Sequence, residues 1–183
     1  MYSKILLFGH GGSGNHGCEA IVRSTMRILN QTLPQNECIL LSNSIDQERK
    51  YGVDKLCSIE DLGKRPKNLR FFLSYINMKL AGKFENFDTY PIRSIIRKNK
   101  NNALALSIGG DNYCYGNNSV LAYQNRLFNN AGIKTVLWGC SIEESVLENP
   151  TDKADLQNYS YIIARESLTF DPFRRRSTRK ETR

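Results

Sequence analysis

The sequence has no long apolar run. A transmembrane helix needs a stretch of about 18 or more apolar residues, and the 183-residue chain contains no such stretch. Its first apolar run, residues 5–8, follows a single lysine and is too short to be the hydrophobic region of a signal peptide. The sequence therefore predicts no transmembrane segment and favours a cytoplasmic location.

Cysteine and histidine are scarce. The five cysteines are an odd number, and no two of them form a CxxC pattern. This excludes a disulfide framework or a cysteine-rich zinc site as the basis of the fold, and it fits a reducing cytosol. The only histidines, His10 and His16, lie close together near the N-terminus, and no metal cluster or Ser-His-Asp arrangement can be assembled from the spacing of the other residues. We therefore expect no metal.

The net charge of +8 is concentrated at the C-terminus. Residues 174–183 carry six Lys or Arg and one Glu, so the rest of the chain is only mildly basic. A nucleic-acid-binding protein combines a basic face with a recognisable binding module, and none is present, so we expect no nucleic-acid partner. The composition predicts one sizeable domain over residues 1–170 and a basic, disordered tail over residues 171–183 that contributes little to the fold.

Strand-like apolar runs alternate with helical segments along the chain. The predicted strands are residues 5–8, 38–41, 103–108, 134–138 and 159–164, and the predicted helices are residues 17–30, 119–131 and a short one after Pro150. Residues 45–68 predict irregular structure. Two basic amphipathic stretches, 69–80 and 91–99, predict helices that cover the sheet, with a membrane-surface role as the alternative. This alternation predicts an α/β fold, a Rossmann-like parallel sheet with flanking helices.

Glycine-rich or polar clusters follow four of the predicted strands. They read GHGGSGNHG, GGDNY, GCSIEE and ARES in chain order. In parallel α/β sheets, ligands bind outside the carboxyl ends of the strands. We therefore expect the loops that start at Gly9, Gly109, Gly139 and Arg165 to lie on one edge of the sheet and to form a binding site.

The first of these loops matches two phosphate-binding motifs incompletely. Gly9-x-Gly11-x-x-Gly14 has the spacing of the dinucleotide-binding fingerprint, but the next predicted strand ends in Leu-Ser-Asn-Ser, without an acidic residue for a ribose. A Walker A motif needs Lys-Ser/Thr where Asn15 and His16 stand. The loop can still present backbone N–H groups and a helix N-terminus to an anion. The alternative is a tight turn between a strand and a helix.

Polar side chains in the loops are the candidate functional residues, and each has a structural alternative. His10 and His16 offer acid–base chemistry or a phosphate contact, and otherwise are solvated loop residues. Glu19, in the first turn of the predicted helix, also stabilises the helix dipole. Asp111 and Asn112 have the chemistry to hydrogen-bond sugar hydroxyls or to cap a turn. Arg165 can form an ion pair with the glutamate that follows it.

At these loops the sequence resembles a known family. The segments GNHGCEAI, LSIGGDNY, VLWGCSIEE and YIIARES, in this order, look like the polysaccharide pyruvyl transferases, whose members carry a G-N-x-G-D-E-A-type loop, a G-G-type loop, a G-x-S-I-type strand end and an R-[DE]-x-x-S-like element. The matching positions are 14–20, 109–111, 139–142 and 165–167. Cys18 stands where many members have aspartate, and Ser167 follows Glu166 directly.

This resemblance implies a fold and an activity. Family members are similar to GT-B-like glycosyltransferases, in which two Rossmann-like domains face a cleft; this chain would supply the N-terminal domain, with the C-terminal domain missing or supplied separately. The implied reaction moves the enolpyruvyl unit of phosphoenolpyruvate onto two hydroxyls of a sugar as a ketal and releases phosphate. The acceptor would belong to a cell-surface polysaccharide or its lipid-linked oligosaccharide precursor, as in exopolysaccharide or cell-wall biosynthesis. Phosphoenolpyruvate would be the donor substrate, with no further cofactor, and the chain alone would be a poor or inactive enzyme.

The resemblance also implies which residues contact the substrate. The residues expected to bind it are Gly12, Gly14, Asn15, His16, Gly110, Asp111, Asn112, Ser141 and Arg165. The candidates for a catalytic role are His16, Glu19 and Asp111, with no step assigned to any of them. Two hypotheses from other classes stay open: a non-catalytic carbohydrate-binding remnant and a dinucleotide-binding module.

Overall fold

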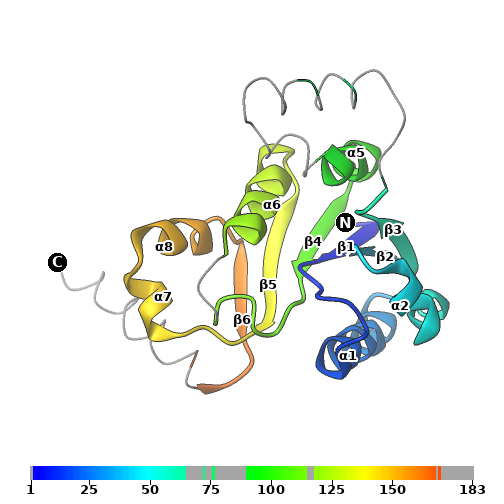
Figure 1. Cartoon of the computed structure of the whole chain (residues 1–183), viewed down its shortest axis with the longest axis horizontal. Coiled ribbons are helices and arrows are strands. Elements are labelled where there is room, and N and C mark those ends of the chain that lie inside the picture. Colours follow the sequence, from blue (N-terminus) through cyan, green and yellow to red (C-terminus); the bar gives the residue numbers. More distant parts are fainter. Residues whose placement is uncertain are drawn as a thin grey trace.

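The chain folds around one parallel β-sheet with helices on both faces (Figure 1). The computed structural model describes residues 2–64, 90–114 and 118–167, together with positions 72, 76 and 169. The strands are β1 (Lys4–Phe8), β2 (Glu37–Ser42), β3 (Ser58–Asp61), β4 (Ala103–Ser107), β5 (Lys134–Cys140) and β6 (Tyr161–Ala164). The helices are α1 (His16–Thr32), α2 (Ile45–Lys50), α5 (Tyr90–Asn99), α6 (Ser119–Asn130), α7 (Glu144–Glu148) and α8 (Pro150–Leu156), with a 3-10 turn, η1, at Val53–Lys55.

The strand order is that of a Rossmann-type sheet. The six strands follow one another in space as β3-β2-β1-β4-β5-β6, and every neighbouring pair is parallel. Leu6 of β1, for example, lies opposite Ile39 of β2 and Ala105 of β4. β1 and β4 are neighbours in the sheet, although residues 9–102 separate them in the chain. The strand order therefore reverses between β1 and β4. Sheets of this type bind ligands at that point, outside the carboxyl ends of the strands. The predicted α/β class and Rossmann-like parallel sheet are confirmed.

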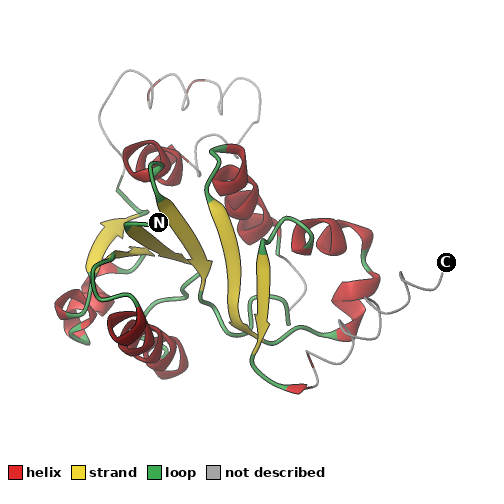
Figure 2. Cartoon of the chain, turned by 180° about the vertical axis from the view of Figure 1, so that it is seen from behind, coloured by secondary structure: helices red, strands yellow, loops and turns green. Residues whose placement is uncertain are grey.

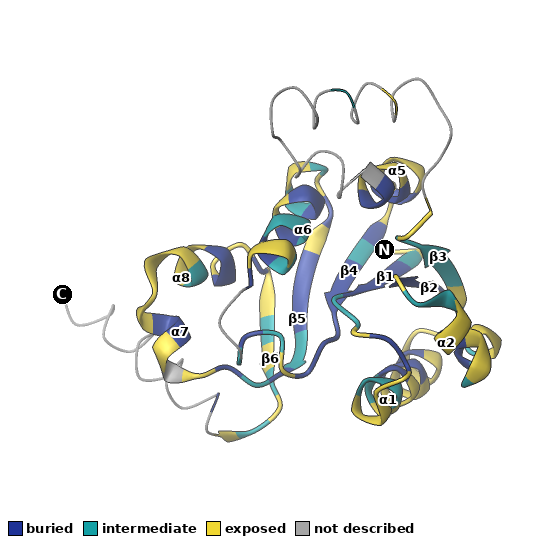
Figure 3. Cartoon of the chain, in the orientation of Figure 1, coloured by how far each residue is buried: buried dark blue, intermediate teal, exposed yellow. Residues whose placement is uncertain are grey.

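Alternate residues of the strands build a core on each face of the sheet. On one face Ile5 and Leu7 of β1 belong to a cluster with α1 and η1, and on the other Leu6 and Phe8 belong to a cluster with α5, α6, α7 and α8. Strands buried on both faces are apolar throughout, which explains the unbroken run Ile-Leu-Leu-Phe. Figure 2 shows helices on both sides of the sheet, and Figure 3 shows that the central strands are buried.

The helix that follows β1 is long, amphipathic and capped. The sequence predicts a helix over residues 17–30, and the structure extends it to His16–Thr32. Asn15 is the N-cap residue: its side-chain oxygen accepts the N–H groups of Gly17 and Cys18, which have no partner within the helix. The residues that this helix buries are Val22, Thr25, Met26 and Leu29. The sequence predicts two adjoining apolar stripes, residues 21, 25 and 28 and residues 22, 26 and 29; the second is confirmed, whereas Ile28 of the first is 42% exposed.

The prediction of irregular structure over residues 45–68 is wrong for the part that the structure describes. Helix α2, turn η1 and strand β3 all lie within it. Each element is too short to show a helical or an alternating pattern, and β3 contains a single apolar residue, Ile59. β3 forms because it pairs with β2 at the edge of the sheet, and no local pattern encodes that pairing.

The other elements agree with the sequence in type. Helix α5 buries three isoleucines, so the amphipathic stretch 91–99 does cover the sheet. The short helix α7 was not predicted, and β6 begins at Tyr161, two residues later than expected. The stretch 69–80, apart from positions 72 and 76, and the tail 171–183 lie outside the described residues. None of the described helices combines the length and the apolar character needed to cross a bilayer.

Candidate functional site

The carboxyl ends of the neighbouring parallel strands β1, β4, β5 and β6 meet at one edge of the sheet (Figure 1). Backbone hydrogen bonds tie the loops that follow the last three strands to one another. The N–H of Ser141 donates to the carbonyl of Gly110 at 2.7 Å, and the N–H of Arg165 donates to the carbonyl of Cys140 at 2.9 Å. The predicted meeting of the glycine-rich and polar loops at one edge is confirmed.

A cluster around Arg165 lies at this edge and joins three loops. The Arg165 guanidinium donates from Nη2 to Asp111 Oδ1 at 2.9 Å and to the hydroxyl of Ser141, and from Nε to Glu166 Oε2 at 3.2 Å. Asp111 comes from the loop after β4, Ser141 from the loop after β5, and Arg165 and Glu166 from the end of β6. These four residues form the Arg165 cluster. Half of the arginine side chain is exposed, so the cluster faces solvent.

Hydrogen bonds within and beside the Arg165 cluster keep the Glu166 carboxylate in its charged form. Its carboxylate accepts hydrogen bonds from the hydroxyls of Thr169 and Ser141, the latter at 3.0 Å. Thr169, Ser141 and Arg165, in that order of importance, hold the pKa of Glu166 below its usual range. The ion pair predicted between Arg165 and Glu166 is present. The guanidinium is therefore already shared between two carboxyl groups, those of Asp111 and Glu166.

The loop after β4 brings the Arg165 cluster next to the start of α1. A Cβ atom on Gly110 would lie 2.8 Å from Arg165 Nη1 and 3.0 Å from Ile21 Cδ1, so a larger residue would require these two side chains to move. Asn112 turns inward, and its amide donates to the hydroxyl of Ser107 at 3.3 Å. Arg165, which follows β6 directly, and Ile21 of α1 therefore approach each other across the end of β4.

A buried polar network anchors the loop after β4 to the core of the protein. Tyr113 is fully buried, and its hydroxyl bonds the carboxylate of Asp155 and the hydroxyl of Tyr159. The second Asp155 oxygen accepts the amide of Asn125 at 3.1 Å, and Asn125 accepts the hydroxyl of Thr135 at 2.7 Å. Burial raises the pKa of both tyrosines, so they remain neutral. The network connects the loop after β4 to α6, α8 and β5.

The glycine loop, residues 9–15 between β1 and α1, is attached on its inner side to α2 by a buried carboxylate. Glu48 is fully buried, and it accepts hydrogen bonds from His10 Nε2 at 3.0 Å, from the Ser42 hydroxyl at 2.9 Å and from the Ser13 hydroxyl. The His10 side chain is 1% exposed, and burial lowers its pKa, although Glu48 partly opposes this. A neutral imidazole with its proton on Nε2 satisfies the carboxylate. His10 therefore points into the protein and not into the cleft.

On the outer side of the glycine loop, several backbone N–H groups already donate hydrogen bonds to side chains of the protein. The N–H of Gly14 donates to Gln47 Oε1 at 3.0 Å, and the side chain of Asn15 accepts the first N–H groups of α1. Gly12 has a φ of +96°, and a Cβ atom on Gly12 or Gly14 would lie 2.7 Å from Gln47 Oε1. Both glycines thus have a packing role, and an anion would need to displace Gln47 or Asn15 to bind these donors. This weakens the dinucleotide hypothesis, since Glu48 is also too buried to contact a ribose.

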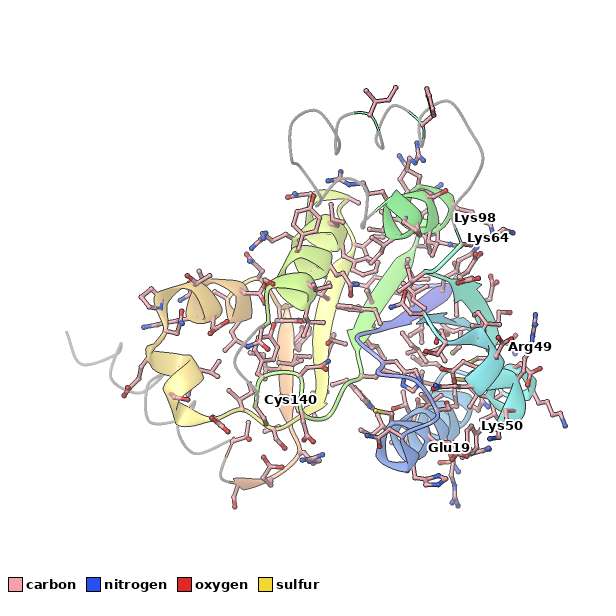
Figure 4. All side chains as sticks on the ribbon, in the orientation of Figure 1. Glu19, Arg49, Lys50, Lys64, Lys98 and Cys140 are labelled. Atoms are coloured by element: carbon pink, nitrogen blue, oxygen red, sulfur yellow. The ribbon has the colours of Figure 1, made fainter. Side chains whose placement is uncertain are left out.

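His16 and Glu19 occupy the exposed first turn of α1. The His16 side chain is 81% exposed; its Nδ1 lies 3.3 Å from Glu19 Oε2, and its ring meets Tyr51 edge-on. Arg23 donates to Glu19 at 2.8 Å, and the hydrogen bonds from Arg23 and then His16 lower the pKa of Glu19. Figure 4 shows Glu19 on α1 and Cys140 where β5 ends, both in the lower part of the view, toward which the strands run. Glu19 is therefore a charged acceptor at neutral pH and a weak candidate for donating a proton.

Thiolate and metal chemistry receive no support from the described residues. Burial raises the pKa of Cys140 to about 12 and that of Cys57 to about 11, so both remain thiols. All five cysteines are free. In the described parts of the chain, no three His, Cys, Asp or Glu side chains are grouped so that they could hold a metal ion.

The family model described as polysaccharide pyruvyl transferase matches residues 15–181. The chain belongs to the polysaccharide pyruvyl transferase family. The resemblance stated from the four motifs is thereby confirmed, and the family is one of transferases. No curated protein and no solved structure matches the chain.

The residues that the family resemblance singled out fall into two groups. Gly110, Asp111, Ser141 and Arg165 contact one another in or beside the Arg165 cluster, with Asn112 in the same loop. Gly12, Gly14, Asn15, His16 and Glu19 lie at the start of α1, where Gln47 contacts the two glycines. The two groups lie on either side of the point where the strand order reverses, and the contact of Gly110 with Ile21 joins them.

Several residues that build this edge were not found from the sequence. Glu48 and Asp155 give no signal, because each lies in a short polar segment with a second acidic residue and nothing local distinguishes the buried one from the exposed one. Matching the last motif to residues 165–167 assigns its hydroxyl to Ser167; counted from Arg165, however, Thr169 occupies the final position of R-[DE]-x-x-S. Its buried hydroxyl bonds Glu166 and accepts the N–H of Ile142 at 3.0 Å.

Proposed function

We propose that the carboxyl edge of this sheet is the acceptor side of a pyruvyl transfer site that uses phosphoenolpyruvate as donor. The observation that supports this is the family match over residues 15–181, which covers the four motifs except for Gly14 of the first; the other three lie at the ends of β4, β5 and β6. The acceptor is a sugar of a cell-surface polysaccharide or of its lipid-linked precursor, and the reaction takes place in the cytoplasm.

The proposed reaction sets clear chemical demands. Two sugar hydroxyls form bonds to the central carbon of phosphoenolpyruvate, the bond from that carbon to the phosphate oxygen breaks, and the vinyl carbon gains a proton to become a methyl group. Of the two hydroxyl protons, one balances the new methyl group and the other leaves with phosphate or solvent. The site therefore needs a base for the hydroxyl, a proton donor for the vinyl carbon, and cations for the phosphate.

The described side chains fit the acceptor better than the donor. Asp111, Asn112 and Ser141 supply carboxylate, amide and hydroxyl groups, which suit sugar hydroxyls. Glu19, with its lowered pKa, fits the role of a base and not that of the acid. His16 is exposed and remains the candidate for the proton transfer.

The cations that the donor requires are scarce at this edge. In residues 9–15, 108–114, 139–143 and 165–167, Arg165 is the single Lys or Arg, and it is shared between Asp111 and Glu166. Phosphoenolpyruvate carries a phosphate and a carboxylate, so one shared guanidinium does not balance its charge. We therefore assign most of the phosphate contacts to a second Rossmann-like domain that faces this edge.

The test is to titrate the purified chain separately with a sugar carrying two free neighbouring hydroxyls, phosphoenolpyruvate and NADH. We expect the sugar to bind, and its affinity to fall about tenfold or more in Arg165→Gln. We expect phosphoenolpyruvate to bind weakly and NADH not to bind. The matched control is Arg49→Gln, which removes an exposed arginine from α2, as Figure 4 shows. Phosphate release should require addition of a second domain from the same gene neighbourhood.

Three results would contradict the proposal in different ways. Rapid phosphate release by residues 1–183 alone would show that the donor site is complete in this chain. NADH binding tighter than sugar binding would favour the dinucleotide-binding module. Sugar binding without phosphate release in the presence of the second domain would favour a non-catalytic carbohydrate-binding module.

A further inference from the structure

A groove runs between α5 and α6, on the face of the sheet opposite α1. The two helices pack against each other, and the cavity between them has a volume of about 450 Å³. The residues that line it are Arg93, Ile96, Arg97, Tyr123, Arg126, Leu127, Asn130 and Ala131. None of these belongs to the loops at the carboxyl edge of the sheet. This α5–α6 groove is therefore separate from the transfer site proposed above.

Two arginines lie against one aromatic ring in the α5–α6 groove, and a third arginine lines the groove beside them. Arg93 donates to the hydroxyl of Tyr123 at 2.5 Å, and its guanidinium lies 5.8 Å from the centre of the Tyr123 ring. The Arg126 guanidinium lies 5.7 Å from the same ring. Arg97 is exposed one helical turn beyond Arg93 on α5. The cation–π contact holds the Arg126 guanidinium in place while leaving its donors for an anion.

Two of the arginines in the α5–α6 groove, Arg97 and Arg126, are not neutralised by the described residues around them. None of the described lining residues is acidic, and within the described chain neither Arg97 nor Arg126 forms an ion pair. Glu60 of β3 is paired with Lys98, an α5 residue that does not line the groove. The segment that leads into α5, residues 65–89, has five Lys or Arg and two acidic residues, so the sequence adds further positive charge.

The floor of the α5–α6 groove is apolar. Ile96 and Leu127 are buried core residues whose side chains reach the groove, with Ala131 beside them. A groove with guanidinium groups at its rim and aliphatic side chains at its base suits an amphiphilic anion better than a free inorganic ion. Phe72, in the basic stretch that precedes α5, is 57% exposed, which is the type of side chain that enters a lipid interface.

We infer that the α5–α6 groove binds the phosphate headgroup of an anionic lipid and holds this face of the protein on a membrane surface. The guanidinium groups contact the phosphate, and the apolar floor takes the first carbons of the lipid. Arginine supports this assignment because its planar fork matches phosphate oxygens in pairs. Each basic residue near an anionic surface contributes to the free energy of binding, and this attraction falls with ionic strength. Binding to the membrane should therefore weaken as the salt concentration is raised.

The test is co-sedimentation of the full chain with vesicles of anionic phospholipid, compared with vesicles of zwitterionic lipid. The variant Arg97→Gln/Arg126→Gln removes two positive charges from the groove. The control Arg27→Gln/Arg49→Gln removes two from exposed positions of α1 and α2, and both proteins keep the basic segment 174–183. We expect about thirtyfold weaker binding to anionic vesicles for the groove variant and less than about threefold for the control. Wild-type protein should not bind the zwitterionic vesicles.

Calorimetric titration with inorganic pyrophosphate separates a lipid from a soluble phosphate ligand. Weak binding of pyrophosphate that the groove variant loses, together with strong vesicle binding, supports the inference. Equal losses in the groove and control variants would overturn it, because net charge alone would then explain the attraction. Tight pyrophosphate binding without vesicle binding would also overturn it and identify the groove as a site for a soluble phosphate.

Discussion

Replacing Glu48 with alanine tests whether one buried carboxylate holds the glycine loop against α2. Glu48 is fully buried and accepts hydrogen bonds from His10, Ser13 and Ser42. The alanine variant leaves three buried donors without an acceptor and opens a cavity beneath the loop. We expect the glycine loop to loosen and the free energy of unfolding to fall.

The size of this effect follows from the contacts. A hydrogen bond to a charged group contributes about 1.5–3 kcal/mol, but bonds that share one acceptor are not additive. His10, Ser13 and Ser42 are neutral donors, and each buried donor left without an acceptor costs about 1–3 kcal/mol, so we expect Glu48→Ala to cost about 3–5 kcal/mol in all. Glu48→Gln keeps the shape and one acceptor oxygen, so its cost should be about 1–2 kcal/mol.

Urea unfolding followed by circular dichroism measures both variants. With a slope of about 2 kcal/mol per molar urea for a chain of this size, the midpoint of Glu48→Ala should fall by about 2 M. Asp46→Ala is the matched control, because Asp46 is an exposed carboxylate on the same short helix and should cost less than about 1 kcal/mol. If Glu48→Ala and Asp46→Ala differ by less than about 1 kcal/mol, the carboxylate does not anchor the loop and the reasoning fails.

Two further predictions use the same assay. Because burial lowers the pKa of His10 from 6.5, its stabilising contribution should be complete above pH 6.5 and be lost as the pH falls from 6.5 toward the lower folded-state value; the stability difference between wild type and His10→Gln should therefore shrink at pH 5, and a constant or larger difference would contradict this. Tyr113→Phe removes the hydroxyl that bonds Asp155 and should cost about 1.5–3 kcal/mol, whereas Tyr161→Phe, at a 69% exposed position of β6, should change stability by less than about 0.5 kcal/mol. Similar losses in the two tyrosine variants would argue against the buried network.

The sequence by itself determined the class of the fold and the edge where the site lies. The unbroken apolar run of β1 indicates a strand buried on both faces, and α1 shows its apolar stripe over several turns. Strands and helices that alternate lead to a parallel sheet, and a parallel sheet puts all loops after its strands on one edge. The glycine-rich and polar clusters could therefore be assigned to a common edge before their contacts were known.

The tertiary structure decided what each polar residue at that edge does. Glu48 and His10 are 38 positions apart, and Asp111 and Arg165 are 54 positions apart, so their pairing depends on how β1, β4 and β6 are placed in the sheet. Local pattern cannot separate a histidine that points into the cleft from one that bonds a buried carboxylate, because both occur in the same glycine loop. Strand β3 is a similar case, since its edge position results from pairing with β2 and not from its own composition. Periodicity reports the neighbours of a residue along the chain, whereas burial and ion pairing are set by residues that only the fold brings together.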